Sequence, residues 1–200
     1  MCFFFRQAKS ALEVQNRFKA EFEPAPFEGE ADYNGFLFPR VPVITNSDPG
    51  KIKLFGWGLI PHWAKDDSIK KYTLNARIET INEKPSFRGS VNRRCLIPAD
   101  GFYEWQWLDE KGKRKQKHLL SFPGDELFAF AGLWSEWINR STGELVNTCT
   151  ILTTEANELL SRIHNSKKRM PVIPAKENEM KWLSGGMLAT GNDGLMATPV

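Results

Sequence analysis

The feature that most constrains the fold is a succession of short apolar segments through the middle of the chain. Four such runs, rich in β-branched and aromatic residues, occupy positions 93–108, 117–122, 127–137 and 146–153. Turn-like sequences, DEKGK and NRSTGE, follow the first and the third of them. Apolar runs of this length between turn signals are typical of antiparallel strands joined by hairpins. The sequence therefore predicts a sheet as the framework.

Two helices are expected beside this sheet. Residues 8–22 carry apolar side chains at helical spacing, and a second helix is expected to start near Thr154, in TTEANELLSRI. Residues 35–45 read as extended, because Pro39 and Pro42 exclude a helix interior. The chain has 200 residues and 41% of them are hydrophobic, which suffices for one core. We predict a single α+β domain over residues 1–200.

Composition excludes several classes of protein. No apolar run approaches the roughly 18 residues that a membrane helix needs, and the start MCFFFRQAKS does not resemble a signal peptide. The expected location is the cytoplasm, with no membrane partner. The three cysteines are an odd number without CxxC spacing, which predicts reduced thiols, no metal site and no cofactor. A net charge of +3 is compatible with a polyanionic partner.

The position of Cys2 directly after the initiator methionine raises a chemical possibility. Removal of Met1 would leave Cys2 with a free α-amine beside its thiol, so one residue would carry two nucleophiles. The alternative is structural, since free cysteine often packs as a small apolar residue at the start of a buried strand.

Glu104 is a carboxylate in an aromatic setting, between Tyr103 and Trp105. In a strand it shares a face with Phe102 and Gln106. An apolar environment raises a carboxyl pKa, which suits proton transfer near neutral pH. The alternative is a glutamate on an edge strand that faces water.

Asn75, Arg77 and His164 are further candidates. Asn75 and Arg77 share a face if NARIET is extended, where an amide can orient an amine and a guanidinium can bind phosphate. Turn capping is the alternative for both. His164 lies near the end of the second predicted helix, so it is either a proton-transfer group or a C-terminal cap.

Taken together, five motifs resemble the SOS response-associated peptidase (SRAP) family. They are MC, WGLIPHWAK, NARIET, RRCLIPADGFYEW and RMPVI, and they run in this order from Cys2 to about Pro174. The resemblance implies a β-rich, PUA-like open barrel that shields abasic sites in single-stranded DNA. It implies that Cys2 is the nucleophile, that Asn75 orients its amine, and that Glu104 and His164 are catalytic.

Single-stranded DNA binding requires cations for phosphates and aromatic rings for bases. The candidate phosphate contacts are Arg77, Arg88, Lys167, Lys168 and Arg169. Trp57 and Trp63 are candidates for stacking, with packing in the core as the alternative. The basic run KGKRKQK reads as a solvated turn.

Two departures from the family pattern matter. Phe3, Phe4 and Phe5 precede Arg6 where many relatives have MCGR or MCYR, so an early phosphate-binding arginine is absent or displaced. The loop HNSKKRMP is also longer than in compact relatives. Three functions remain open: a covalent abasic-site shield with lyase chemistry, a cysteine autopeptidase that removes residues ahead of Cys2, and a noncatalytic nucleic-acid-binding module. We expect a monomer.

Overall fold

The computed structural model describes residues 2–23, 31–186, 192 and 194–200, and it confirms the predicted α+β class. Five strands form a barrel in the order β5-β4-β7-β10-β11. Their bounds are β4 Arg40–Thr45, β5 Asp48–Trp57, β7 Arg94–Ala99, β10 Phe128–Ile138 and β11 Leu145–Glu155. The barrel closes where β5 and β11 pair in parallel, with Gly56 opposite Thr148 and Trp57 opposite Cys149, so it is not the open barrel that the resemblance implied. Three short strands extend it, namely β2 (Glu21–Phe22), β6 (Asn75–Arg77) and β12 (Arg169–Pro171).

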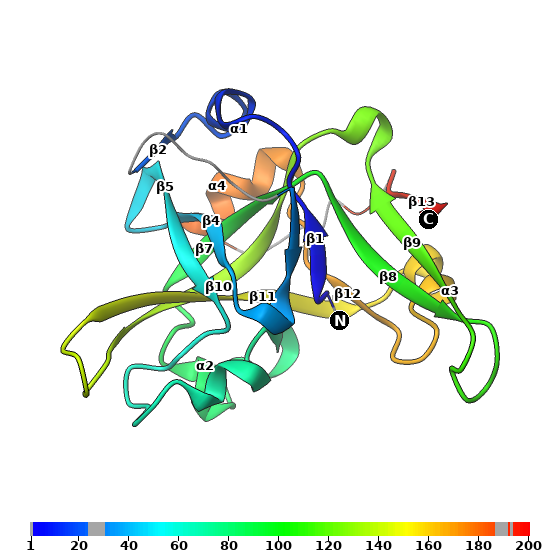
Figure 1. Cartoon of the computed structure of the whole chain (residues 1–200). Helices are drawn as coiled ribbons and strands as arrows, with labels where there is room; N and C mark the ends of the chain where they lie inside the picture. Colours follow the sequence, from blue (N-terminus) through cyan, green and yellow to red (C-terminus); the bar gives the residue numbers. More distant parts are fainter. Residues whose placement is uncertain (1, 24–30, 187–191, 193) are drawn as a thin grey trace.

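A second sheet lies beside the barrel in the order β13-β9-β8-β1-β3 (Figure 1). Its strands are β1 Phe4–Arg6, β3 Asp32–Asn34, β8 Gly101–Trp107, β9 Lys115–Ser121 and β13 Met196–Pro199. The chain passes from the barrel to this sheet at Asp100, which separates β7 from β8. Asp100 is buried and accepts hydrogen bonds from Arg6 Nε at 2.5 Å and from the Ala8 amide at 2.7 Å. The predicted single run over 93–108 is therefore two strands in two sheets.

The buried side chains form two main layers. Alternate residues of the barrel strands, such as Cys95 and Ile97, belong to one cluster that also contains Phe5 and Phe102 from the second sheet. The residues between them, such as Leu96, belong to a second cluster under the helices. This period of two is the pattern of strands that are covered on both faces. One continuous core thus joins the barrel to the second sheet.

The helices are shorter than predicted. Helix α1 spans Ala11–Phe18, with a capping box between Ser10 and Glu13 at its start. Lys19 ends it in the left-handed conformation, and Glu21–Phe22 pairs with β5 instead of continuing the helix. The prediction of a helix over 8–22 was wrong at both ends, because the spacing of apolar residues does not show where a strand partner distant in the sequence lies.

The second predicted helix also starts later than expected. Helix α3 spans Glu158–Ile163 and its N-cap is Asn157, whose side chain accepts from the Leu160 amide. Thr154 belongs to β11, where it pairs with Met170 of β12. The threonine is therefore part of a ladder and not a cap.

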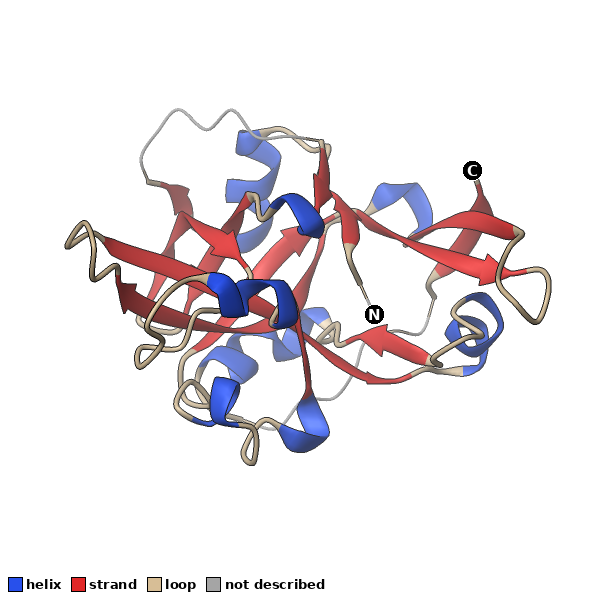
Figure 2. Ribbon diagram, turned by 60° about the horizontal axis from the view of Figure 1, so that its bottom comes forward, coloured by secondary structure: helices blue, strands red, loops and turns tan. Residues whose placement is uncertain are grey.

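The remaining helical elements are short and lie at the periphery of the strands (Figure 2). They are α2 (Pro85–Arg88), α4 (Glu179–Leu183) and the 3₁₀ turns η1 (Gly35–Leu37), η2 (Ser68–Tyr72), η3 (Ile78–Thr80), η4 (Pro123–Asp125) and η5 (Lys176–Asn178). Within the predicted extended segment 35–45, the first residues form η1 and the rest form β4. Part of the glycine-rich tail over 184–200 lies outside the described residues. Among the helices described, none is long and apolar enough to cross a membrane.

Candidate active site

Cys2 lies at the start of the second sheet, two residues before β1, and is fully buried. Its thiol is 3.8 Å from the Phe4 carbonyl oxygen, to which it donates. Asn75 Nδ2 donates to the Cys2 carbonyl oxygen at 2.9 Å. The other amide atom, Asn75 Oδ1, is buried and has no hydrogen-bond partner among the residues that the structure describes. Asn75 therefore holds Cys2 through Nδ2, while its Oδ1 is an acceptor without a partner among the described residues.

The strand pairing explains how Asn75 reaches Cys2. Strand β6 pairs in parallel with β11, where Asn75 is opposite Ile151. In Figure 1 the N-terminal end of β1 lies near β12, which also pairs with β11. NARIET is extended at Asn75–Arg77 as predicted, so Asn75 and Arg77 share a face and Arg77 is exposed.

Glu104 points into the same region from β8. It is opposite His118 of β9 and lies on the face that carries Phe102, as predicted. Only 4% of Glu104 is exposed, so the alternative of a water-facing edge glutamate is wrong. Burial raises the pKa of the Glu104 carboxyl from 4.5 to about 7. Near neutral pH this group can both give and accept a proton.

His164 completes the cluster. Its Nε2 is 4.0 Å from Glu104 Oε2, and its Nδ1 is 2.7 Å from the Arg169 carbonyl oxygen. Burial lowers the pKa of the imidazole to about 4, so the ring is neutral at neutral pH. The Arg169 amide also lies 3.4 Å from Nδ1, but the carbonyl contact is shorter and a carbonyl oxygen can only accept, so we assign the proton to Nδ1 and leave Nε2 as an acceptor on the side of Glu104. His164 is also the C-cap residue of α3 and its amide donates to the Leu160 carbonyl, which confirms the capping alternative, while its role in proton transfer stays a prediction.

The long loop after His164 is fastened to the end of β8. Asn165 Oδ1 accepts from the Trp107 amide at 3.0 Å, and Asn165 Nδ2 donates to the Trp107 carbonyl at 2.9 Å. Lys168 adopts a left-handed conformation and its amide donates to the His164 carbonyl, which closes the loop. Sequence reasoning missed Asn165, because nothing local indicates that its partner is 58 residues away.

The buried thiol of Cys2 is not a thiolate. Burial raises the pKa of this thiol far above its ordinary value, and the neighbouring Glu104 charge raises it further. Cys95 and Cys149 are also buried and free, inside the barrel. Within the described part of the chain, no group of three or more His, Cys, Asp or Glu side chains is placed to hold a metal ion.

The predicted DNA contacts fall into two groups. Arg77, Arg88, Lys167 and Lys168 are exposed, and 48% of Trp63 is exposed. Trp57 is buried and donates from Nε1 to the Leu74 carbonyl at 2.9 Å, which confirms the core-packing alternative.

The prediction for Arg169 is also contradicted. Arg169 is 8% exposed and makes two hydrogen bonds of 2.9 Å to Glu79 and one of 2.8 Å to the Thr153 carbonyl. Its guanidinium joins β12 to β11 and η3, so it is not available to a phosphate.

Comparisons with known proteins give the family of the chain and proteins of similar fold. Residues 1–197 match the family model described as SOS response associated peptidase (SRAP). The abasic site processing protein YoqW of Bacillus subtilis is 50% identical over 161 residues, covering 78% of this chain and 69% of that protein. The chicken abasic site processing protein HMCES is 31% identical, over 82% of this chain and 55% of that protein. A Bacteroides thetaiotaomicron protein of known crystal structure superposes with a TM-score of 0.87 at 32% identity, covering all of this chain and 92% of that one.

Proposed function

Because the chain belongs to the SRAP family, we propose that it processes abasic sites in single-stranded DNA by a covalent bond between Cys2 and the lesion. The observation that carries the proposal is the hydrogen bond from Asn75 to Cys2. One amide atom binds the Cys2 carbonyl, and Oδ1 has no partner among the described residues. Once Met1 is removed, Oδ1 is the acceptor that orients the new α-amine.

The α-amine is the first nucleophile. Its reference pKa of about 7.7–8.0 leaves a substantial neutral fraction near neutral pH, whereas the thiol is protonated. The amine nitrogen attacks C1′ of the ring-opened sugar, and loss of one water gives an imine. The Cys2 sulfur then adds to C1′ and its proton passes to the nitrogen, which closes a five-membered thiazolidine. No oxidant or reductant is needed, because only water leaves.

Glu104 moves the protons of this sequence. In its acidic form it protonates the sugar ring oxygen as the ring opens and the hydroxyl that leaves as water. In its basic form it removes a proton from the attacking nitrogen. A pKa of about 7 keeps both forms populated near neutral pH. His164 accepts through Nε2 and relays protons with Glu104, since a neutral, buried imidazole is poorly suited to hold a phosphate.

The same groups support lyase chemistry. An imine at C1′ acidifies the protons at C2′, so a base that removes one of them expels the 3′ phosphate by β-elimination. Glu104 or His164 is the base in this step. Thiazolidine closure removes the imine and competes with this elimination, so the relative rates of the two steps set the balance between shielding and cleavage.

The DNA is held by exposed cations around the site. Arg77 lies two residues from Asn75 on the same face, and Lys167 and Lys168 follow His164. Arg88 and Trp63 provide a further cation and a further ring. The protein binds its substrate as a monomer in this proposal. A thiol peptidase acting on other chains would need an accessible thiolate, and the buried, protonated Cys2 does not favour that function.

The test is covalent capture of a single-stranded oligonucleotide with one abasic site. Wild-type protein lacking Met1 is expected to give an adduct that survives denaturation, and Cys2→Ala none. Cys2→Ser should give at most an adduct that does not survive, because the hydroxyl replaces the sulfur that closes the ring.

Protein that retains Met1 distinguishes noncovalent binding of the oligonucleotide from formation of the covalent adduct. Its peptide nitrogen is not nucleophilic, so it should bind the oligonucleotide but form no stable adduct. Intact mass establishes the state of Met1 in each sample. A stable adduct of equal yield in Cys2→Ala, or in protein with Met1, would contradict the proposal.

A further inference from the structure

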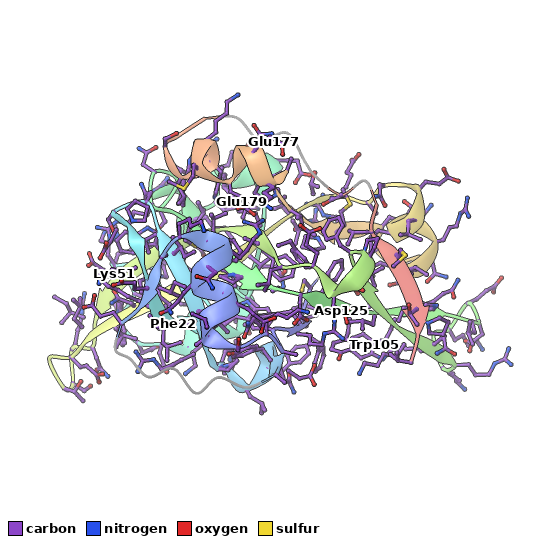
Figure 3. The ribbon with its side chains drawn as sticks, turned by 90° about the horizontal axis from the view of Figure 1, so that it is seen from above. Phe22, Lys51, Trp105, Asp125, Glu177 and Glu179 are labelled. Carbon is purple, nitrogen blue, oxygen red and sulfur yellow. The ribbon has the colours of Figure 1, made fainter. Side chains whose placement is uncertain are left out.

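A group of aromatic side chains lies on the outer face of the second sheet beside Cys2. We call Phe3, Phe4, Phe36 and Trp105 the aromatic strip. The ring centroids of Phe3 and Phe36 are 4.9 Å apart, those of Phe4 and Phe36 are 5.8 Å apart, and those of Phe4 and Trp105 are 5.0 Å apart. Phe36 is 55% exposed, and the other three are partly exposed. Figure 3 shows Trp105 at the periphery of the molecule.

Phe3 packs against the main core cluster, whereas Phe4 and Trp105 point away from the core. In β1 the side chain of Phe5 is fully buried, so Phe4 points to the opposite face. In β8 the buried side chains are those of Phe102 and Glu104, so Trp105 points outward as well. The aromatic side chains at these outward positions do not fill the interior, where the sequence already provides Phe5 and Phe102. Contiguous aromatic rings that remain partly accessible at the surface are typical of a binding surface.

Lysines accompany the rings along the same face. Lys117 of β9 is opposite Trp105, and Lys115 is opposite Trp107. The Lys117 ammonium is 3.8 Å from the Tyr103 ring centroid, and the Lys115 ammonium is 5.5 Å from that of Trp107. Neither lysine takes part in an ion pair with another residue in the described part of the chain. Their charge remains available, so the face suits a partner with flat apolar surfaces and negative charges.

The strip is continuous with the candidate active site. A hollow of about 260 Å³ is lined by Phe3, Phe4, Phe36, Glu104, Trp105 and Lys115. Cys2, which carries the nucleophiles, is adjacent to Phe3 in the chain. A nucleotide next to a lesion held at Cys2 would therefore lie over this face.

We propose that the aromatic strip binds unpaired nucleobases that flank the lesion, with Lys115 and Lys117 neutralising the phosphates between them. Nucleobases stack on aromatic rings whatever their sequence, and lysines beside such rings bind the backbone. This chain has no arginine directly after its MC start, and Arg6 is paired with Asp100 and Asp125. Stacking on the aromatic strip would take the place of the phosphate contact of such an arginine. This inference rests on the proposed function and assigns it a second, noncovalent binding surface.

The test uses a probe that cannot form a covalent bond. A single-stranded oligonucleotide carries a tetrahydrofuran, which lacks the aldehyde, and one 2-aminopurine placed in turn at each neighbouring position on either side. Stacking quenches the fluorescence of 2-aminopurine, so wild-type protein is expected to quench it at one side of the lesion analogue. Phe36→Ala and Trp105→Ala should abolish that quenching and weaken binding by about tenfold.

Matched variants distinguish stacking from general damage to the surface. Leu37→Ala removes a side chain that is 76% exposed in the same turn but is not part of the strip, and it should leave quenching unchanged. Phe36→Trp should keep the quenching, because it keeps a ring. Lys115→Gln with Lys117→Gln should reduce the salt dependence of binding while leaving the quenching in place.

Three results would overturn the inference: no position quenched by wild-type protein, equal quenching and affinity in Phe36→Ala and wild type, or loss in Leu37→Ala equal to that in Phe36→Ala. If Phe36→Ala instead converted an oligomer to a monomer in sedimentation without changing DNA binding, the strip would be a contact between copies. Covalent capture of a true abasic site by the wild type is measured in parallel. Its failure would refute the proposed function, whereas its success without quenching would refute only the strip.

Discussion

At the scale of single residues, environment decides what each polar group can do. Glu104 is a chemically ordinary carboxyl, yet burial moves its pKa to about 7. His164 is moved the other way, to about 4, for the same reason, because burial disfavours whichever form carries the charge. The result is a pair in which the acid is protonated at about the pH where the base is already neutral.

Glu104→Gln tests this arrangement through the reaction. The variant is expected to slow adduct formation by roughly 100-fold, because an amide cannot exchange a proton with the reacting groups. Affinity for the tetrahydrofuran oligonucleotide should stay the same, since Glu104 is proposed to move protons and not to bind phosphate. Single-turnover capture and equilibrium binding measure the two quantities. Equal capture rates in wild type and variant would remove Glu104 from the chemistry.

Glu104 also predicts a dependence of stability on pH. Its folded-state pKa of about 7 lies above the ordinary 4.5, so between these values the folded protein holds a proton that the unfolded chain has lost. Stability therefore falls as pH rises through this window, by up to about 3 kcal/mol. Glu104→Gln should lose this slope and gain stability relative to wild type at pH 8, measured by urea unfolding at several pH values. Glu110→Gln, at an exposed position, is the control, and a wild-type slope in Glu104→Gln would contradict the prediction.

At the scale of elements, the site depends on contacts between segments that are distant in the chain. Strand β6 brings Asn75 to Cys2, and β8 brings Glu104 to the same place. The loop after α3 brings His164, and Asn165 holds that loop to the end of β8. The length of the loop is therefore compatible with a well-placed histidine, because two hydrogen bonds fix its start.

Asn165→Ala should loosen this attachment. Loss of both hydrogen bonds to Trp107 frees the start of the loop, and capture should slow by about 10- to 100-fold, as expected for misplacement of a reacting group by about an ångström. Thermal stability should change little, since the contact is exposed. Ser166→Ala, at the next position, is the control and should react like wild type. Unchanged capture by Asn165→Ala would show that the loop holds its position without this contact.

At the scale of the whole molecule, closure of the barrel holds the two halves of the site together. Strands β5 and β11 close it, β11 carries β6 and β12, and the second sheet shares its core. Glycine is required where β10 crosses the interior. A Cβ at Gly132 would lie 2.6 Å from the Thr150 carbonyl oxygen and 2.8 Å from Cys95 Sγ. Because the barrel and the second sheet share one core, we interpret residues 1–200 as one domain.

Gly132→Ala is therefore expected to destabilise the fold by about 1–3 kcal/mol, because the added methyl has no space without movement of backbone. The same substitution at Gly50 meets nothing within 4 Å and serves as the control. Denaturant unfolding measures both variants. Equal stability of the two would mean that the barrel adjusts to the methyl at no cost.

The sequence by itself determined the class of the fold, the hairpins and the side chains that we propose as reacting groups. Period-two segments between turn sequences predicted β8 to β11 correctly, because hairpins are local. The order of the five motifs indicated the family, and the face shared by Phe102 and Glu104 follows from strand geometry alone.

Only the tertiary structure decided which of these groups meet and which are already engaged. Asn75 binds the Cys2 carbonyl, Trp57 fills the core, and Arg169 is paired with Glu79. The ends of α1 and α3 were likewise set by strand partners far along the chain. The physical reason is that burial and pairing depend on neighbours that a linear pattern does not contain, so the sequence states a side chain's chemistry but not its environment.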